Sequence, residues 1–146
     1  MRAQRRGGQF LAAAVVAALV AAPLRAQEST PGITLLYQNF PNPFPNGTST
    51  TTCLWFDLRI EDAVTLGIYD LRGRLVRTIV PSPLVGGVLP AGRYGRQSAG
   101  TNAGCNPAFA WDGRGSDGNR VPPGVYLARL YADGRWQSRK IVFRGP

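Results

Sequence analysis

The 146-residue chain has few side chains that could take part in catalysis. It contains no histidine, which excludes serine–histidine and cysteine–histidine nucleophiles, imidazole acid–base catalysis and histidine-ligated metals. Its two cysteines do not by themselves form a structural zinc site. We therefore expect a protein that is not an enzyme, with no cofactor, no bound metal and no small-molecule substrate.

Two carboxylates, Asp112 and Asp117, flank a glycine-rich loop and are the best candidates for a metal site. Calcium requires six or more oxygen ligands, of which two carboxylates supply only a part. Each aspartate also precedes a glycine, and the Asp-Gly pair is favoured in tight turns because glycine accepts positive φ. We interpret both residues as turn formers, and a weak calcium site between them is the alternative.

The first 26 residues have the pattern of a secretory signal peptide. Three arginines near the start precede an unbroken apolar run of 13 residues, Phe10 to Ala22, and Ala26 is a small residue suited to cleavage. The run is too short to span a bilayer unaided, although an uncleaved membrane anchor is the alternative. We expect a mature chain that starts at Gln27 and is exported through the inner membrane to the periplasm, the outer surface or the medium.

The two cysteines, Cys53 and Cys105, suit an oxidising compartment and could form one disulfide. The bond would close a loop of roughly 50 residues and contribute about 4 kcal/mol in the chain-entropy model. The even number of cysteines and the expected export favour the disulfide, and two separate thiols are the alternative.

The mature chain is moderately basic. Without the four arginines of the signal peptide, 13 basic and 8 acidic residues remain, a net charge of +5. The basic residues lie around one predicted turn, 72–77, and along the last strand, 135–144, rather than on one helix or groove. Such spacing is typical of solvated faces and protected sheet edges, so we expect no nucleic-acid binding.

Strand patterns and turn residues fill the mature chain. Glycine and proline together make up 30 of the 146 residues, and no window has a sustained helical period. Residues 125–131 and 136–144 form the clearest pair of strands, joined as a hairpin at 132–134. Shorter strands are predicted at 33–37, 50–58, 63–69, 75–80 (after a turn with positive φ at Gly73) and 108–111. The pattern predicts an all-β antiparallel β-sandwich of about seven short strands.

The segment QNFPNPFPN, residues 38–46, has three prolines within five residues. Because proline cannot donate a backbone hydrogen bond, we predict an edge segment or a polyproline-like strap containing Pro41, Asn42 and Pro43. Its large apolar side chains are Phe40 and Phe44, and we expect both to pack over one end of the core. A proline-rich ligand for another protein is the alternative.

Seven short motifs follow one another in the mature chain. They are LYQNFPNPF at 36–44, FDL at 56–58, IYDLRGRLVR at 68–77, LPAG at 89–92, WDG at 111–113, GVY at 124–126 and RKIVFR at 139–144. In this order they resemble the C-terminal sorting domain of type IX secretion substrates, the Por secretion system type A sorting domain. The same pattern is shared with the immunoglobulin-like domain of the flagellar hook-capping family. The resemblance covers nearly the whole mature chain.

The resemblance implies an Ig-like β-sandwich at 36–146 after a short polar lead at 27–35. In that family the folded domain is a sorting signal. An outer-membrane translocon recognises it, and a sortase-like protease then removes it. The resemblance also implies that the translocon recognises the last hairpin. The residues concerned are Gly124, Val125, Tyr126, Arg139, Lys140 and Arg144. The remaining motif residues are then structural, namely Phe40, Pro41, Asn42, Pro43, Phe44, Gly73, Trp111, Asp112 and Gly113.

Two features depart from the family pattern. The chain has an inserted loop at about 97–106, and only residues 27–33 precede the domain, so we expect no cargo within this chain. The first interpretation is a sorting or cell-surface association module, whose partners are the outer-membrane secretion machinery or cell-surface components. The second is a free-standing structural or adhesive module that self-associates by adding a strand at an exposed edge. The third is a hook-cap-like assembly factor, which the signal peptide disfavours.

Overall fold

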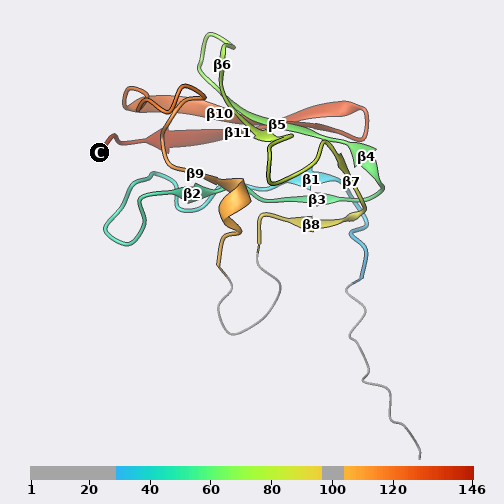
Figure 1. Ribbon diagram of the computed structural model, residues 1–146. Coiled ribbons are helices and arrows are strands. Elements are labelled where there is room, and N and C mark those ends of the chain that lie inside the picture. The colour runs from blue at the N-terminus through green and yellow to red at the C-terminus, as the bar shows by residue number, and fades with distance from the viewer. Residues whose placement is uncertain (1–28, 97–103) are drawn as a thin grey trace, which may run out of the picture.

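The structure, a computed structural model, describes residues 29–96 and 104–146. In these residues the chain forms eleven short strands and one 3-10 turn, arranged as two layers around one core (Figure 1). The predicted all-β antiparallel sandwich is confirmed. The elements are β1 (Leu35–Leu36), β2 (Thr52–Cys53), β3 (Phe56–Leu58), β4 (Asp62–Ala63), β5 (Thr65–Tyr69), β6 (Leu75–Val80), β7 (Val88–Leu89), β8 (Gly92–Tyr94), η1 (Pro107–Phe109), β9 (Ala110–Trp111), β10 (Gly124–Ala132) and β11 (Arg135–Phe143).

The upper layer in Figure 1 is a four-stranded antiparallel sheet in the order β11–β10–β5–β6. Strands β10 and β11 pair along nine residues each, and β10 also pairs with β5. At the hairpin turn, Asp133 and Gly134 have φ of 54° and 71°, a region that glycine and aspartate tolerate better than other residues. The C-terminal hairpin predicted from the sequence is confirmed.

The lower layer is the three-stranded sheet β1–β3–β8, with the short pair β2–β9 beside it (Figure 1). The structure has four more strands than the predicted seven. Two of them, β7 and β8, lie between predicted strands, and the other two arise because the chain changes partner within a predicted strand. Residues 50–58 divide into β2, which pairs with β9, and β3, which pairs with β1 and β8. Residues 63–69 divide in the same way into β4, which pairs with β7, and β5.

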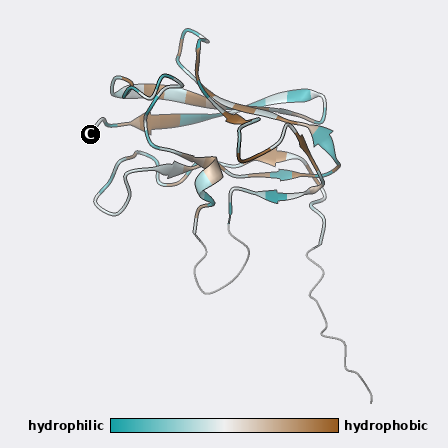
Figure 2. Ribbon diagram, viewed as in Figure 1, coloured by the Kyte–Doolittle hydropathy of each residue, from teal (hydrophilic) through white to brown (hydrophobic). Residues whose placement is uncertain are grey.

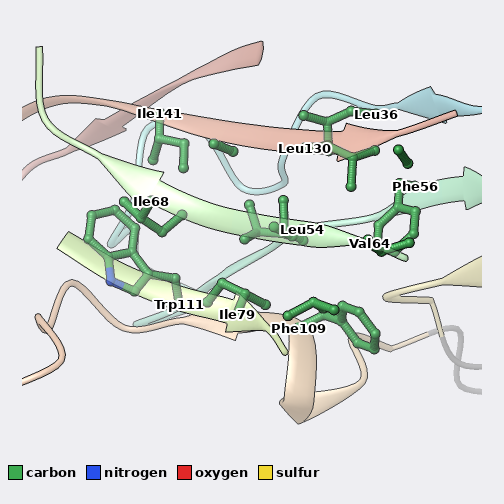
Figure 3. Packing of buried hydrophobic residues seen from close by; sticks show 14 of the residues in the cluster. Leu36, Leu54, Phe56, Val64, Ile68, Ile79, Phe109, Trp111, Leu130 and Ile141 are labelled. Atoms are coloured by element: carbon green, nitrogen blue, oxygen red, sulfur yellow. The ribbon is translucent and has the colours of Figure 1, made fainter. Parts of the chain in front are cut away.

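The core lies between the two layers. Figure 3 shows Ile68, Leu130 and Ile141 of the four-stranded sheet facing the side chains that come from the opposite layer. The inward positions predicted for 63–69 are confirmed, since Val64, Leu66 and Ile68 are buried, but Gly67 of the opposite face is buried as well. Figure 2 shows the apolar end of β11 near the C-terminus and the hydrophilic tip of the β10–β11 hairpin. Gly73, with φ of 79°, forms the turn between β5 and β6 as predicted.

The disulfide between Cys53 and Cys105 is formed, with a Cα–Cα distance of 5.6 Å. It joins β2 to the segment that precedes η1. The predicted excursion at 93–107 begins as part of β8, and residues 97–103 of the inserted loop lie outside the described residues. The predicted signal peptide, 1–26, also lies outside them. Within the described ranges, no helix is long and apolar enough to cross a membrane.

Candidate recognition site at the C-terminal strand

The motifs GVY and RKIVFR lie side by side in the C-terminal hairpin. Gly124 pairs with Phe143, Val125 with Val142, and Tyr126 with Ile141. Antiparallel pairing thus brings together two motifs that start 15 positions apart in the sequence.

The three basic residues of the candidate site do not form one cluster. Arg139 and Lys140 are neighbours on β11, and adjacent residues of a strand point to opposite faces of the sheet. Lys140 is exposed and Arg139 is half-buried, while Arg144 follows the end of the strand and is exposed. The resemblance therefore implies a set of residues that the fold distributes around the end of β11.

The segment Gln38–Phe44, called the strap below, covers the free edge of β11. Phe44 N donates to Val142 O at 3.0 Å, and Arg144 N donates to Phe44 O at 2.7 Å. The side-chain amide of Asn42 extends this pairing, since its Nδ2 donates to Lys140 O at 2.9 Å and its Oδ1 accepts from Val142 N at 2.8 Å. Gln38 Nε2 also donates to Lys140 O at 2.9 Å.

These bonds satisfy four edge groups of β11 between Lys140 O and Arg144 N. An unpaired edge is a site for uncontrolled pairing with another chain, and buried backbone groups without partners are costly. Because the strap prolines have no backbone N–H, amide side chains supply part of the pairing. The predicted strap is therefore an edge cover for the C-terminal strand.

One of the two strap phenylalanines is not buried as expected. Phe44 is fully buried, whereas Phe40 is 67% exposed, so the expectation that Phe40 packs over the core is wrong. The backbone of Phe40 pairs with Cys53, and the neighbouring Asn39 is the residue that points inward. Asn39 Nδ2 donates to Thr52 Oγ1 at 2.7 Å, and the same hydroxyl donates to Pro41 O. The strap thus begins with a buried polar anchor and ends with a buried aromatic one; Pro43, beside Phe44, is half-buried.

Four aromatic residues from four of the motifs meet beneath the strap. Ring centroids are 5.4 Å apart for Phe44 and Trp111, 5.1 Å for Phe44 and Phe143, and 5.2 Å for Trp111 and Tyr126. Such distances are typical of favourable aromatic pairs. The contacts give a physical reason for the joint occurrence of the strap, WDG, GVY and C-terminal motifs, because each contributes one ring to the same cluster.

The WDG motif forms a tight turn against this cluster. Gly113 has φ of 78°, and a Cβ atom at this position would lie 2.4 Å from the ring of Phe143. Glycine is therefore required here both by the backbone conformation and by the close approach of the ring. Trp111 Nε1 donates to Arg114 O at 2.9 Å, and Asp112 Oδ1 accepts from Arg114 N at 3.1 Å.

Both candidate calcium ligands take part in local turns. Asp112 bonds to Arg114 as described, and Asp117 accepts hydrogen bonds from the backbone and the side chain of Asn119. These bonds hold the pKa of the Asp117 carboxyl below its usual value, and the bond from the Asn119 side chain has the larger effect. Within residues 29–96 and 104–146, no three cysteine, aspartate or glutamate side chains are placed so that together they could hold a metal ion. The geometry favours the turn interpretation of this pair.

Two tyrosines form the same backbone contact. Tyr126 Oη donates to Pro122 O at 2.6 Å, and Tyr94 Oη donates to Pro90 O at 2.5 Å. The sequences PPGVY and PAGRY share the pattern Pro-x-Gly-x-Tyr. In many β-sandwiches a tyrosine near the start of a strand bonds through its hydroxyl to the backbone a few residues upstream, which is called a tyrosine corner. Tyr126 has this arrangement and is also a buried core residue. The repeated pattern in the sequence is a signal from which the contact of Tyr94 could have been predicted.

We expect the protein to lose stability in alkali. Burial raises the pKa of Tyr126, and the negative charge of Asp70 raises it further; burial also raises the pKa of Tyr94. A phenol with a raised folded-state pKa contributes stability that is present below its unfolded value of about 10 and is lost as pH rises above it. Denaturant unfolding between about pH 8 and pH 11 measures this loss.

Replacing Tyr126 by phenylalanine provides the control for this alkaline effect. The variant loses the bond to Pro122 O, which should cost about 1 kcal/mol at neutral pH. Its stability should fall less steeply above about pH 10 than that of the native chain. An equal slope in the two proteins would exclude Tyr126 as a source of the alkaline loss.

Comparisons with known proteins find weak similarity to solved structures. No protein-family model and no curated protein sequence matches the chain. Among solved structures, PorZ of Porphyromonas gingivalis, described as an essential bacterial surface component of the type IX secretion system, aligns with a TM-score of 0.43 and 20% identity. The alignment covers 75% of this chain and 11% of PorZ, so the chain spans about a ninth of its length. At this TM-score the match establishes neither fold nor function, and the β-sandwich rests on the strand pairing itself.

Proposed function

We propose that the protein is an exported, non-catalytic recognition module that serves type IX secretion sorting or association with the cell surface. The observation that carries this proposal is that four of the seven motifs that resemble a sorting domain meet in one structural unit. The strap covers the edge of β11, GVY pairs with the other edge, and WDG supports the aromatic cluster beneath. A bonded cysteine pair suits the oxidising compartment that export implies.

The geometry suits a sorting signal that its partner recognises in the folded state. β10 pairs with the whole of β11, and the strap pairs with its C-terminal part, so this end of the strand presents a fixed set of side chains instead of a loose peptide. Lys140 and Arg144 are exposed there and available to a partner with negative charge. The partner class is the outer-membrane secretion machinery or another cell-surface component. The non-catalytic part of the proposal rests on the sequence, which has no histidine for imidazole acid–base catalysis.

A second candidate function is a structural or adhesive module that self-associates by strand addition. This candidate needs an open edge, and the strap occupies the edge of β11 from Lys140 O to Arg144 N. On the other layer, β8 is an edge strand of its sheet and offers the place for such an addition. Oligomers that form with rising protein concentration and disappear in a variant with proline in β8 would favour this candidate.

A reporter fusion tests the sorting proposal. A reporter enzyme is placed between the signal peptide and residues 27–146 and expressed in a bacterium that has a type IX secretion system. We expect the reporter at the cell surface or in the medium, and we expect its retention in the periplasm when Arg139, Lys140 and Arg144 are all replaced by alanine. Alanine at Arg72, Arg93 and Arg120, which are exposed elsewhere, removes the same charge and is the matched control. Equal secretion of both triple variants would contradict recognition at β11.

A further inference from the structure

The outer face of the four-stranded sheet carries a stack of aromatic and cationic side chains. The guanidinium carbon of Arg129 lies 5.2 Å from the ring centre of Tyr69 and 4.7 Å from that of Trp136. Tyr131 extends the stack, with its ring centre 5.1 Å from that of Trp136. These four residues, from β5, β10 and β11, are called the platform below. We propose that the platform binds an acidic polysaccharide.

The backbone opposite Arg129 keeps the platform flat. Gly67 pairs with Arg129, and a Cβ atom on Gly67 would lie 3.0 Å from the ring of Tyr69 and 3.0 Å from the side chain of Leu75. A larger residue at this position would displace the Tyr69 ring that flanks the guanidinium. The missing side chain therefore allows the rings and the guanidinium to lie side by side across three strands.

The cation at the centre of the platform is free to bind an anion. Within the described residues, Arg129 forms no ion pair, and its guanidinium donates no hydrogen bond. Lys140 lies on the same face as Trp136, since the two are four positions apart on β11. None of the residues that alternate onto this face of β5, β10 and β11 is acidic. A guanidinium whose plane is fixed by stacked rings can bind a carboxylate with two parallel hydrogen bonds.

The size of the face favours one extended chain over a globular partner. Strands β10 and β11, of nine residues each, are about 30 Å long, and with the shorter β5 the three strands are about 15 Å wide, so the face has an outline of at most roughly 450 Å². A standard protein interface buries about 800 Å² on each partner. Trp136 and Tyr131 are 49% and 39% exposed, so their rings can contact flat apolar surfaces of a ligand such as the C–H faces of sugar rings.

The common modes of peptide binding fit this face poorly. Strand addition requires an open edge, but the strap pairs with β11 from Lys140 O to Arg144 N, and Ser116 N donates to Val76 O at the edge of β6. Strand addition would also use the edge of the sheet and leave the outer face with its aromatic rings unoccupied. An amphipathic helix or a proline-rich peptide requires an apolar groove, whereas the centre of this face is a cation. Nucleic acid also stacks on aromatic platforms, and the choice of polysaccharide over nucleic acid rests on the proposed export.

Binding of polygalacturonate to the purified chain tests the proposal by isothermal titration calorimetry. The comparison ligands are neutral dextran, polyglutamate and single-stranded DNA. We expect saturable binding of polygalacturonate that weakens with added salt, no binding of dextran, and weaker binding of polyglutamate and DNA at equal charge. Replacing Arg129 by methionine should lower the affinity about tenfold or more, and R129K should restore it only in part, because lysine lacks the planar fork.

Arg96 supplies a matched control on the opposite layer. It stacks on Tyr37 and Trp55, with 4.7 Å to each ring centre, but the carboxylate of Asp57 shares that region and accepts a bond from Tyr37 Oη at 2.8 Å. We expect R96M to bind polygalacturonate as the native chain does. Equal losses in R96M and R129M, or tighter binding of polyglutamate or DNA, would overturn the proposal. Binding in solution needs no secretion machinery, so this result stands apart from the outcome of the reporter fusion.

Discussion

Replacing Phe44 by alanine should lower the free energy of unfolding by about 3–5 kcal/mol, a large part of the stability of an ordinary domain. The Phe44 ring is fully buried and contacts both Trp111 and Phe143. Its loss leaves a cavity in the aromatic cluster and removes the anchor that holds the strap on β11. Urea unfolding monitored by tryptophan fluorescence measures the change.

Phe40 offers a matched control for this prediction. It lies in the same strap and also precedes a proline, but its side chain is 67% exposed. Phe40→Ala should therefore change the stability by no more than about 0.5 kcal/mol. Similar losses in the two variants would mean that the strap does not have the arrangement described, with one phenylalanine inside and one outside.

Removing the disulfide should cost about 4 kcal/mol, since the bond joins residues 52 positions apart and limits the freedom of the unfolded chain. The double variant Cys53→Ala/Cys105→Ala and the reduced native chain should lose similar amounts in urea unfolding. Cys53 is buried, so the double variant also loses a small core contribution.

The control for the disulfide prediction is the effect of reductant on each protein. Reductant should destabilise the native chain and leave the double variant unchanged, because the variant has no cysteines. Equal stability of the native chain with and without reductant would show that the bond is absent or contributes nothing.

The sequence predicted the elements whose signals are local. The Asp133–Gly134 turn fixes the register of the C-terminal hairpin, and the alternation at Val64, Leu66 and Ile68 identifies the buried face of β5. Proline content alone predicted that the strap would lie at an edge. The disulfide was a choice between two alternatives, and the structure confirms the bonded one.

The features that the sequence could not predict depend on contacts between distant segments. Asn42 bonds to the backbone of β11 about 100 positions away, and nothing in its neighbourhood indicates this partner. Phe40 and Phe44 have similar neighbours in the sequence, so only the tertiary pairing of Phe40 with Cys53 decides which ring is exposed. The stack of Tyr69 on Arg129 likewise requires the pairing of β5 with β10, which lie about 60 positions apart.

The most direct test of the proposed sorting role is to determine where the chain begins and ends in each fraction of native cells. Cells are divided into periplasmic, surface and medium fractions, and mass spectrometry determines both termini of the chain in each. A sorting module should begin at Gln27 in the exported fractions and should lack residues near its C-terminus at the surface or in the medium. Protein that is intact from Gln27 to Pro146 in every fraction would contradict cleavable sorting and favour the structural module.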